Sequence, residues 1–258
     1  MGYKPLDLEG KVAVVVGGSS GIGKIIALGL AKGGADVVAS ARRLELVQTL
    51  AGEIEALGRR SLRVACDVHD RESLEKLLLA CLDGFGKVDI LVNAAGITKR
   101  APTLDFSEAD WSRIIETNLT GVLRACQVFG RHMIERRYGR IISIASMGTF
   151  LGMFEVAAYS ASKSGLGSLT KSLAVEWASH RICVNAIAPG YFRTSMNERL
   201  LVGTGRGQEI LMRTPMKRFG DLEELVGAAV FLASDAASFV TGTILPVDGG
   251  VLASGVNQ

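Results

Sequence analysis

Seven short apolar runs rich in Val and Ile recur along the chain. Continuous apolarity, rather than strict alternation, is typical of strands that are buried on both faces, as in a parallel sheet. We therefore expect seven parallel strands. The runs are VAVVV from Val12, DVVAS from Asp36, LRVAC from Leu62, DILVN from Asp89, RIISIA from Arg140, ICVNAIA from Ile182 and TILPV from Thr243.

Between these runs lie segments in which apolar residues recur with the period of a helix. Examples are GKIIALGLAKGG from Gly23 and DRESLEKLLLACLDGFG from Asp70. Strands that alternate with helices predict an α/β fold, a doubly wound, Rossmann-like sheet with helices on both faces. No linker, repeat or low-complexity tract marks a boundary, so we expect residues 1–258 to form a single domain.

Local signals refine this frame. Ser107 with Asp110, and Asp221 with Glu224, have the spacing of capping boxes at helix starts. Pro246 lies inside the last apolar run, where its missing N–H would break a ladder bond, so that strand should lie at the sheet edge. Residues 191–218 carry several glycines and no clear strand or helix signature, which is the pattern of a mobile lid over a site.

Composition and charge exclude several classes of partner. The net charge is +3 and no block of like charges exceeds two arginines, which argues against nucleic acid. The four cysteines are scattered and form no C-x-x-C pair, which argues against a metal site and a disulfide framework. The amino terminus lacks the apolar core of a signal peptide, and no apolar run approaches the roughly 18 residues of a membrane span. We therefore expect a cytoplasmic protein with no membrane partner.

A glycine turn, GGSSGIG at residues 17–23, follows the first apolar run and leads into a helix. Glycines let the backbone turn sharply and approach a pyrophosphate, whose charge the helix N-terminus favours. The spacing differs from the general dinucleotide fingerprint, and a flexible loop is the alternative interpretation. The residues expected to hold the dinucleotide here are Gly17, Ser19, Ser20, Gly21, Ile22 and Gly23.

The second apolar run ends in ASARR, at the position where adenosine-ribose preference is normally decided. An acidic residue there binds the 2′-hydroxyl of NAD, whereas an arginine meets the 2′-phosphate of NADP. Ala41 stands where the acid would be, Arg42 and Arg43 follow it, and Ser40 could hydrogen-bond a phosphate. The pattern favours NADP(H), with NAD(H) not excluded; the alternative is that both arginines only solvate the next helix.

Further motifs follow in a fixed order: NAAG from Asn93, Asn118 in ETNLTG, Ser146, YSASK from Tyr159 and PGYFRT from Pro189. Together with the glycine turn, they resemble the short-chain dehydrogenase/reductase family over nearly the whole chain. Within that family the segments around residues 100–121 and 213–250 are most similar to gluconate 5-dehydrogenases, which interconvert gluconate and 5-ketogluconate. Members of this family usually form tetramers, so the resemblance implies a homotetramer or homodimer.

The resemblance implies a reaction centre of Asn118, Ser146, Tyr159 and Lys163. Tyr159 would be the acid in reduction and the base in oxidation, and Ser146 would hydrogen-bond the substrate oxygen. Asn118 would hold a relay water, and Lys163 would bind the nicotinamide ribose. The further cofactor contacts that it implies are Asp67, Val68, Asn93, Ala94, Gly96, Tyr159, Lys163, Pro189, Gly190, Phe192 and Thr194.

Tyr159 and Lys163 lie four residues apart, so a helix places them on one face. A unit charge about 4 Å away contributes on the order of 4 kcal/mol at an effective dielectric of about 20. That energy corresponds to a pKa shift of up to ~3 units, before desolvation of the phenolate opposes it. We therefore expect Lys163 to lower the pKa of the Tyr159 phenol.

Arg100, in the segment ITKRAP, is the first candidate to bind the carboxylate of a sugar acid, because arginine matches a carboxylate with two hydrogen bonds. With Ser146 and Tyr159 it forms the expected substrate site, and no metal is needed. The runner-up substrate is a 3-oxoacyl thioester on a carrier protein, whose acidic surface would then meet the arginines. A nucleotide-binding sensor that has lost turnover is a third possibility, against which the intact reaction centre argues.

Overall fold

The computed structural model describes residues 3–193, 201 and 203–255, and within them six parallel strands form one sheet. Their order across the sheet is β2-β1-β3-β4-β5-β6. The crossover from β2 to β3, on the two sides of β1, is the doubly wound arrangement expected from the sequence. The strands are β1 (Val12–Val16), β2 (Asp36–Ser40), β3 (Ile90–Asn93), β4 (Gly139–Ile144), β5 (Ile182–Pro189) and β6 (Ile244–Val247).

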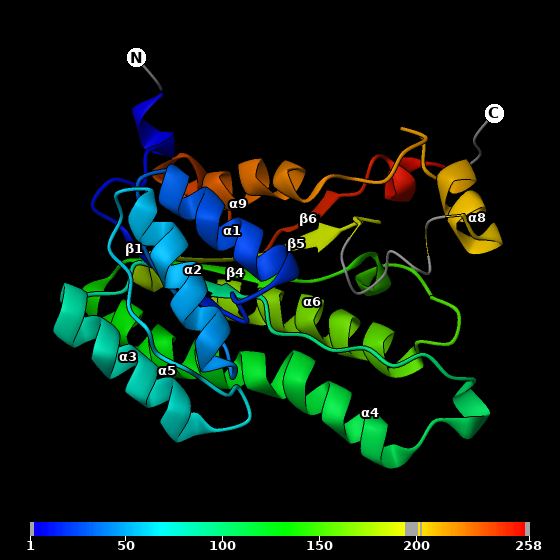
Figure 1. Ribbon diagram of the computed structural model, residues 1–258, viewed down its shortest axis with the longest axis horizontal. Coiled ribbons are helices and arrows are strands. Elements are labelled where there is room, and N and C mark those ends of the chain that lie inside the picture. The colour runs from blue at the N-terminus through cyan, green and yellow to red at the C-terminus, as the bar shows by residue number, and fades with distance from the viewer. Residues whose placement is uncertain (1–2, 194–200, 202, 256–258) are drawn as a thin grey trace.

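Helices cover both faces of the sheet, as Figure 1 shows. α1, α2 and α9 pack in the core on one face, and α3, α5 and α6 pack in the core on the other. The helices are α1 (Gly21–Lys32), α2 (Leu44–Ala56), α3 (Arg71–Phe85), α4 (Glu108–Ile115), α5 (Gly121–Arg136), α6 (Ala157–Trp177), α8 (Gly205–Arg213) and α9 (Val226–Ala233). Of the described helices, none is long and apolar enough to cross a membrane.

β1 shows why the apolar runs are continuous. Ala13 and Val15 lie in one core, and Val14 and Val16 lie in the other. Successive side chains of a strand point to opposite faces, and both faces of this sheet are covered. An unbroken Val run is therefore what a central strand of this fold requires.

The expected seventh strand, LRVAC from Leu62, is absent from the described sheet. The segment runs beside the end of β2, where the Cys66 N–H donates to the Ala41 carbonyl at 3.1 Å and the Ser40 hydroxyl donates to the Val64 carbonyl at 2.5 Å. These bonds do not form the regular ladder of a paired strand. Arg63 within it is exposed and pairs with Glu55 of α2 instead. This apolar run is therefore a half-buried segment at the edge of the sheet that is not hydrogen-bonded as a strand. The described sheet has six strands, so the prediction of seven was wrong by one.

Two other local predictions are confirmed and one is confirmed in part. Asp221 with Glu224 forms a reciprocal capping box ahead of α9. At the start of α4 only half of the expected box forms: the Ser107 hydroxyl oxygen accepts the N–H of Asp110 at 3.2 Å, and the Asp110 carboxylate accepts from the Ser107 hydroxyl rather than from the Ser107 backbone. β6 is the last strand of the sheet, so Pro246 lies on an edge strand.

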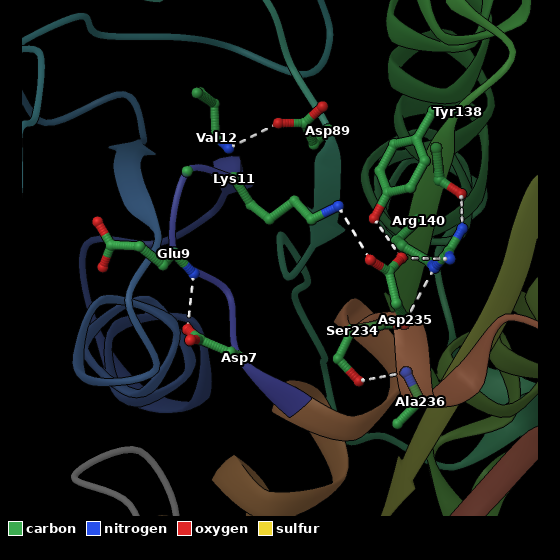
Figure 2. A network of polar contacts seen from close by, with 12 residues as sticks. Asp7, Glu9, Lys11, Val12, Asp89, Tyr138, Arg140, Ser234, Asp235 and Ala236 are labelled. Carbon is green, nitrogen blue, oxygen red and sulfur yellow. Dashed lines mark hydrogen bonds and ion pairs between the residues drawn. The ribbon is translucent and has the colours of Figure 1, made fainter. Parts of the chain in front are cut away.

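A polar network closes the amino ends of the strands (Figure 2). Asp235, which follows α9, accepts hydrogen bonds from the Tyr138 hydroxyl at 2.9 Å, from Arg140 at 3.0 Å and from Lys11 at 3.2 Å. Beside it, buried Asp89 accepts the backbone N–H that opens β1, at 2.9 Å. This network joins the amino ends of β1, β3 and β4 with the residues that follow α9. The motifs singled out in the sequence lie at the opposite, carboxyl ends of the strands.

Candidate active site

The sequence motifs meet at the carboxyl ends of the strands. Gly17 follows β1, Asn93 ends β3, Ser146 follows β4 and Pro189 ends β5. Because the strands are parallel, all four positions lie along the sheet edge that the carboxyl ends of the strands form. This is where open α/β sheets bind their ligands.

Tyr159 and Lys163 project from the first turns of α6. The Lys163 ammonium is buried, donates to the Ile144 carbonyl at 2.6 Å, and lies 5.7 Å from the centre of the Tyr159 ring. Burial lowers the pKa of Lys163 to about 8. Of its three N–H donors, one is bound to Ile144 and no other described group takes the remaining two. Lys163 can therefore bind further oxygen ligands at this edge.

Ser146 follows β4 and lies near Tyr159. Its hydroxyl oxygen accepts the N–H of Gly148 at 3.1 Å, which holds the side chain at the start of a short 3₁₀ turn. Burial raises the pKa of the Tyr159 phenol, and the nearby Ser146 hydroxyl opposes that rise. Ser146 is thus close enough to influence the phenol, and the shared role of the two hydroxyls at a substrate oxygen stays a prediction.

The expected lowering of the Tyr159 pKa by Lys163 is not found. The ammonium lies over the ring and is bound to Ile144, while burial of the phenol dominates and moves its pKa upward. The chain by itself thus keeps Tyr159 protonated at neutral pH. This is the form that donates a proton to a carbonyl oxygen.

Asn118 lies in a π-helical turn, Glu116–Thr120, between α4 and α5. Its side-chain oxygen accepts the N–H of Ile97 at 2.8 Å, and its amide donates to the Ile97 carbonyl at 2.9 Å and to the Ser162 hydroxyl at 3.0 Å. Both amide hydrogens are therefore used to fasten the loop after β3 to α6. The sequence reasoning did not single out Ser162, although it lies inside the YSASK motif.

The glycine turn has the backbone that a pyrophosphate site needs. A Cβ at Gly17 would lie 2.3 Å from the Ala95 nitrogen, and one at Gly23 would lie 2.3 Å from the Gly17 carbonyl oxygen. Gly21 has φ +53, and the Ser20 side chain does not cap the helix that starts here. The first N–H groups of α1 thus face the turn without a side-chain acceptor, which fits a dinucleotide phosphate.

The two arginines after β2 fit a phosphate, whereas Ser40 does not. Arg42 and Arg43 are exposed, and no described acidic side chain pairs with either guanidinium. Ser40 is fully buried, and its hydroxyl hydrogen is donated to Val64. A phosphate needs donors, so the prediction of Ser40 as a phosphate ligand was wrong.

The remaining predicted cofactor residues fall into two groups. Asp67, Ala94, Gly96 and Gly190 are at least partly accessible along the sheet edge, and a Cβ at Gly96 would lie 3.7 Å from the Lys163 nitrogen. The side chains of the second group are buried; they are Val68, Asn93, Pro189 and Phe192. Asn93, for example, donates to the Ser143 hydroxyl at 3.4 Å. Thr194 lies outside the described residues.

The predicted lid stretch, residues 191–218, contains a helix that the sequence analysis did not expect. α8 starts where the Thr204 hydroxyl oxygen accepts the N–H of Gly207 at 3.0 Å. Only Gly207 and Ile210 of this helix are buried, so its apolar signature in the sequence is weak. Movement of the stretch stays a prediction.

Arg100 lies in the loop after β3, and its Nε donates to the Glu155 carboxylate at 2.6 Å. Glu155 comes two residues before α6 and has φ +61, which is uncommon for a residue other than glycine. The neighbouring Lys99 pairs with Asp110 of α4. The sequence offered no signal for Glu155, because its partner is 55 residues away.

A family model described as Enoyl-(Acyl carrier protein) reductase matches residues 16–252 of this chain. A short-chain type dehydrogenase/reductase from Mycobacterium marinum has a structure that superposes with a TM-score of 0.91 at 37% identity, over 97% of this chain and 99% of that one. The chain belongs to the short-chain dehydrogenase/reductase family. As a member of that family it is an NAD(P)-dependent oxidoreductase.

Relatives within the family share the full length of the chain. Gluconate 5-dehydrogenase of Gluconobacter oxydans is 42% identical, with 96% of this chain and 97% of that protein covered. The 2-dehydro-3-deoxy-D-gluconate 5-dehydrogenase of Escherichia coli is 44% identical at the same coverage. A gluconate 5-dehydrogenase from Burkholderia cenocepacia, solved in complex with NADP and tartrate, superposes with a TM-score of 0.93 at 38% identity, over 97% of this chain and 98% of that one.

Proposed function

We propose that this protein is an NADP(H)-dependent oxidoreductase that interconverts a secondary alcohol and a ketone on a sugar acid of the gluconate and 5-ketogluconate type. The observation that carries the proposal is the placement of Ser146 and Tyr159 near each other, beside buried Lys163, whose ammonium lies 5.7 Å from the centre of the Tyr159 ring, at the carboxyl ends of the strands where the glycine turn also lies. Full-length relatives named for gluconate and its derivatives support the substrate class.

The chain's own residues supply binding, orientation and proton transfer. A nicotinamide cofactor, when bound, exchanges the hydride. Tyr159 gives its proton to the carbonyl oxygen in reduction and takes it back in oxidation. Ser146 donates to the same oxygen and stabilises the charge that develops there. Lys163, anchored to Ile144, keeps donors for a ribose hydroxyl and for a proton relay that starts near Asn118.

Preference for NADP(H) over NAD(H) rests on Arg42 and Arg43. Both side chains are exposed beside the adenosine end of the site, and Ala41 presents no carboxylate to repel a 2′-phosphate. Solved relatives with bound NADP support this preference.

The carboxylate of the substrate is assigned to Arg100. Its loop is fastened by Asn118 through Ile97, three residues earlier, and its Glu155 partner leads into the helix that carries Tyr159. In this assignment Arg100 binds the carboxylate and takes no part in the proton or hydride transfer. It can therefore select acids without altering the chemistry.

A second candidate function is reduction of a 3-oxoacyl thioester. Phe150, Leu151 and Phe154 expose apolar side chains on the loop between Ser146 and Tyr159, where an acyl chain could lie. The description of the matching family model also names an acyl-carrier-protein reductase. Glu155, on the same loop, pairs with Arg100 of the loop after β3, and this polar pair favours the sugar acid.

A homotetramer or homodimer is part of the proposal. Trp111 of α4 and Val175 of α6 expose large apolar side chains on helices that contact each other. Burial of such side chains favours association. Light scattering of the purified protein tests this, and a monomer at assay concentrations would contradict it.

The deciding experiment is a substrate screen. Purified protein is incubated with NADP+ or NAD+ and D-gluconate, neutral polyols or simple alcohols, and with NADPH and 5-ketogluconate or a 3-oxoacyl thioester. We expect turnover with gluconate and 5-ketogluconate and little with the thioester. Tyr159→Phe should abolish turnover while NADPH still binds; near-normal turnover in that variant would refute the assignment, and turnover with the thioester alone would favour the second function.

A further inference from the structure

We infer that Glu155 is a positioning residue that sets specificity for a carboxylate-bearing substrate, by holding Arg100 so that one edge of its guanidinium faces the site. The inference rests on the proposed function, because it takes the substrate to be an acid. It adds a residue that neither the motifs nor the family resemblance indicated.

Three contacts join the loop after β3 to the segment before α6. The Arg100 Nε donates to the Glu155 carboxylate at 2.6 Å, and the Ala101 N–H donates to the Glu155 carbonyl at 3.0 Å. The Phe154 ring lies 5.8 Å from the Arg100 guanidinium carbon. The two loops are therefore locked to each other one turn before Tyr159.

The backbone of Glu155 is what makes this lock unusual. Its φ of +61 lies in the left-handed region, where a side chain crowds the backbone and glycine or asparagine is preferred. Strained positions of this kind are kept where the surroundings over-determine them, and they cluster at ligand sites. A glutamate at this position costs backbone energy that a glycine would not, and it contributes a carboxylate that a glycine lacks.

The lock uses only one side of the guanidinium. Arginine has five N–H donors, of which the Nε edge is bound to Glu155, and no other described residue accepts a hydrogen bond from the Nη1 and Nη2 groups. Those two groups form the end-on fork that matches a carboxylate with two hydrogen bonds. Glu155 thus leaves the fork open and removes much of the freedom of a side chain that is 41% exposed.

The charge of Glu155 could act in the opposite sense, because a carboxylate beside Arg100 also competes with the carboxylate of the substrate. The two roles predict opposite signs. If Glu155 positions Arg100, removal of its side chain weakens binding of an acid. If Glu155 is a competitor, removal strengthens it. The bond to Nε rather than to the fork favours positioning.

The test compares Glu155→Gly and Glu155→Gln with the wild type. Glycine relieves the backbone strain and removes the side chain, whereas glutamine keeps an oxygen that can accept from Nε. The dissociation constants of D-gluconate and of its uncharged amide, D-gluconamide, are measured by calorimetry on the protein saturated with NADP+. KM and kcat are measured for the same two compounds.

We expect Glu155→Gly to weaken gluconate binding and raise its KM by about tenfold, the scale of ordering one long side chain. The kcat for gluconate and the binding of gluconamide should stay within about twofold, because neither depends on the fork. Glu155→Gln should restore most of the gluconate affinity. An unchanged or tighter gluconate affinity in Glu155→Gly would overturn the inference, as would equal weakening for gluconamide.

Lys99→Met is the matched control. Lys99 is the cation next to Arg100, is similarly exposed and is also paired with a carboxylate, that of Asp110. Its removal should change gluconate affinity by less than about twofold, because it has no fork to present. Thermal unfolding of each variant shows that it is folded. Absence of gluconate turnover in the wild type counts against the proposed function alone, since the binding comparison still decides the role of Glu155.

Discussion

Asn118→Ala separates the bracing role of this side chain from its proposed role in a proton relay. Asn118 is fully buried and makes three hydrogen bonds, two with the backbone of Ile97 and one with Ser162. At roughly 1 kcal/mol each, their loss should lower the free energy of unfolding by about 3 kcal/mol. Water reaching half-buried Ile97 would reduce that loss, whereas an unsatisfied N–H would increase it.

The assay is urea unfolding followed by fluorescence, together with kcat and KM. Ser162→Ala removes one of the three bonds and should cost about 1 kcal/mol. Asn185→Ala is the control: Asn185 is also fully buried, donates to the Val240 carbonyl at 2.8 Å and accepts the Thr243 N–H at 3.1 Å. It should cost about 2 kcal/mol and leave kcat nearly unchanged.

A loss below about 1 kcal/mol in Asn118→Ala would refute the bracing role. Equal losses of kcat in Asn118→Ala and Asn185→Ala would show that any buried asparagine has the same effect on catalysis. A fall in kcat that is confined to Asn118→Ala is the expected result, because of these two asparagines only Asn118 holds the loop after β3, which carries Arg100.

The remaining predictions concern the cofactor and pH. Arg42→Ala should raise the KM for NADP+ by about tenfold and leave that for NAD+ nearly unchanged, since only the first carries a 2′-phosphate; equal effects in steady-state assays would contradict the phosphate role. Lys163 has a folded pKa of about 8, below its ordinary 10.5, so the folded state binds fewer protons than the unfolded state between these pH values. Its contribution to stability should therefore rise with pH in that window, by up to about 3 kcal/mol. Urea unfolding of the wild type and Lys163→Met from pH 7 to 10 checks this, and a difference that does not change with pH would contradict it.

The fold was predictable because its signals are local and redundant. β1 is covered on both faces, so every position in VAVVV is apolar, and Pro246 excludes its strand from the sheet interior. LRVAC misled because apolar composition does not reveal whether a partner strand offers a full ladder. α8 was missed because it contains few apolar residues and two glycines in its first turn, and only Gly207 and Ile210 of the helix are buried.

The sequence predicted which residues lie together at the carboxyl ends of the strands. It did not predict how their surroundings change their pKa values. Spacing placed Tyr159 and Lys163 on one face, but it could not show that Ile144 binds the ammonium or that burial raises the pKa of the phenol. Ser40 likewise has a hydroxyl that any phosphate could use, until its bond to Val64 is seen. Pairings between distant residues, such as Arg100 with Glu155, leave no trace in a single sequence.

The network around Asp235 has a consequence for the order in which the chain can fold during synthesis. Lys11 and Asp235 are separated by 224 residues, so the ion pair that joins them closes almost the whole chain. Contacts of such sequence separation form late and slow folding. A nascent chain that ends before Asp235 leaves Lys11 and Arg140 without this carboxylate partner, so synthesis must pass Asp235 before these two cations at the amino ends of the strands are neutralised.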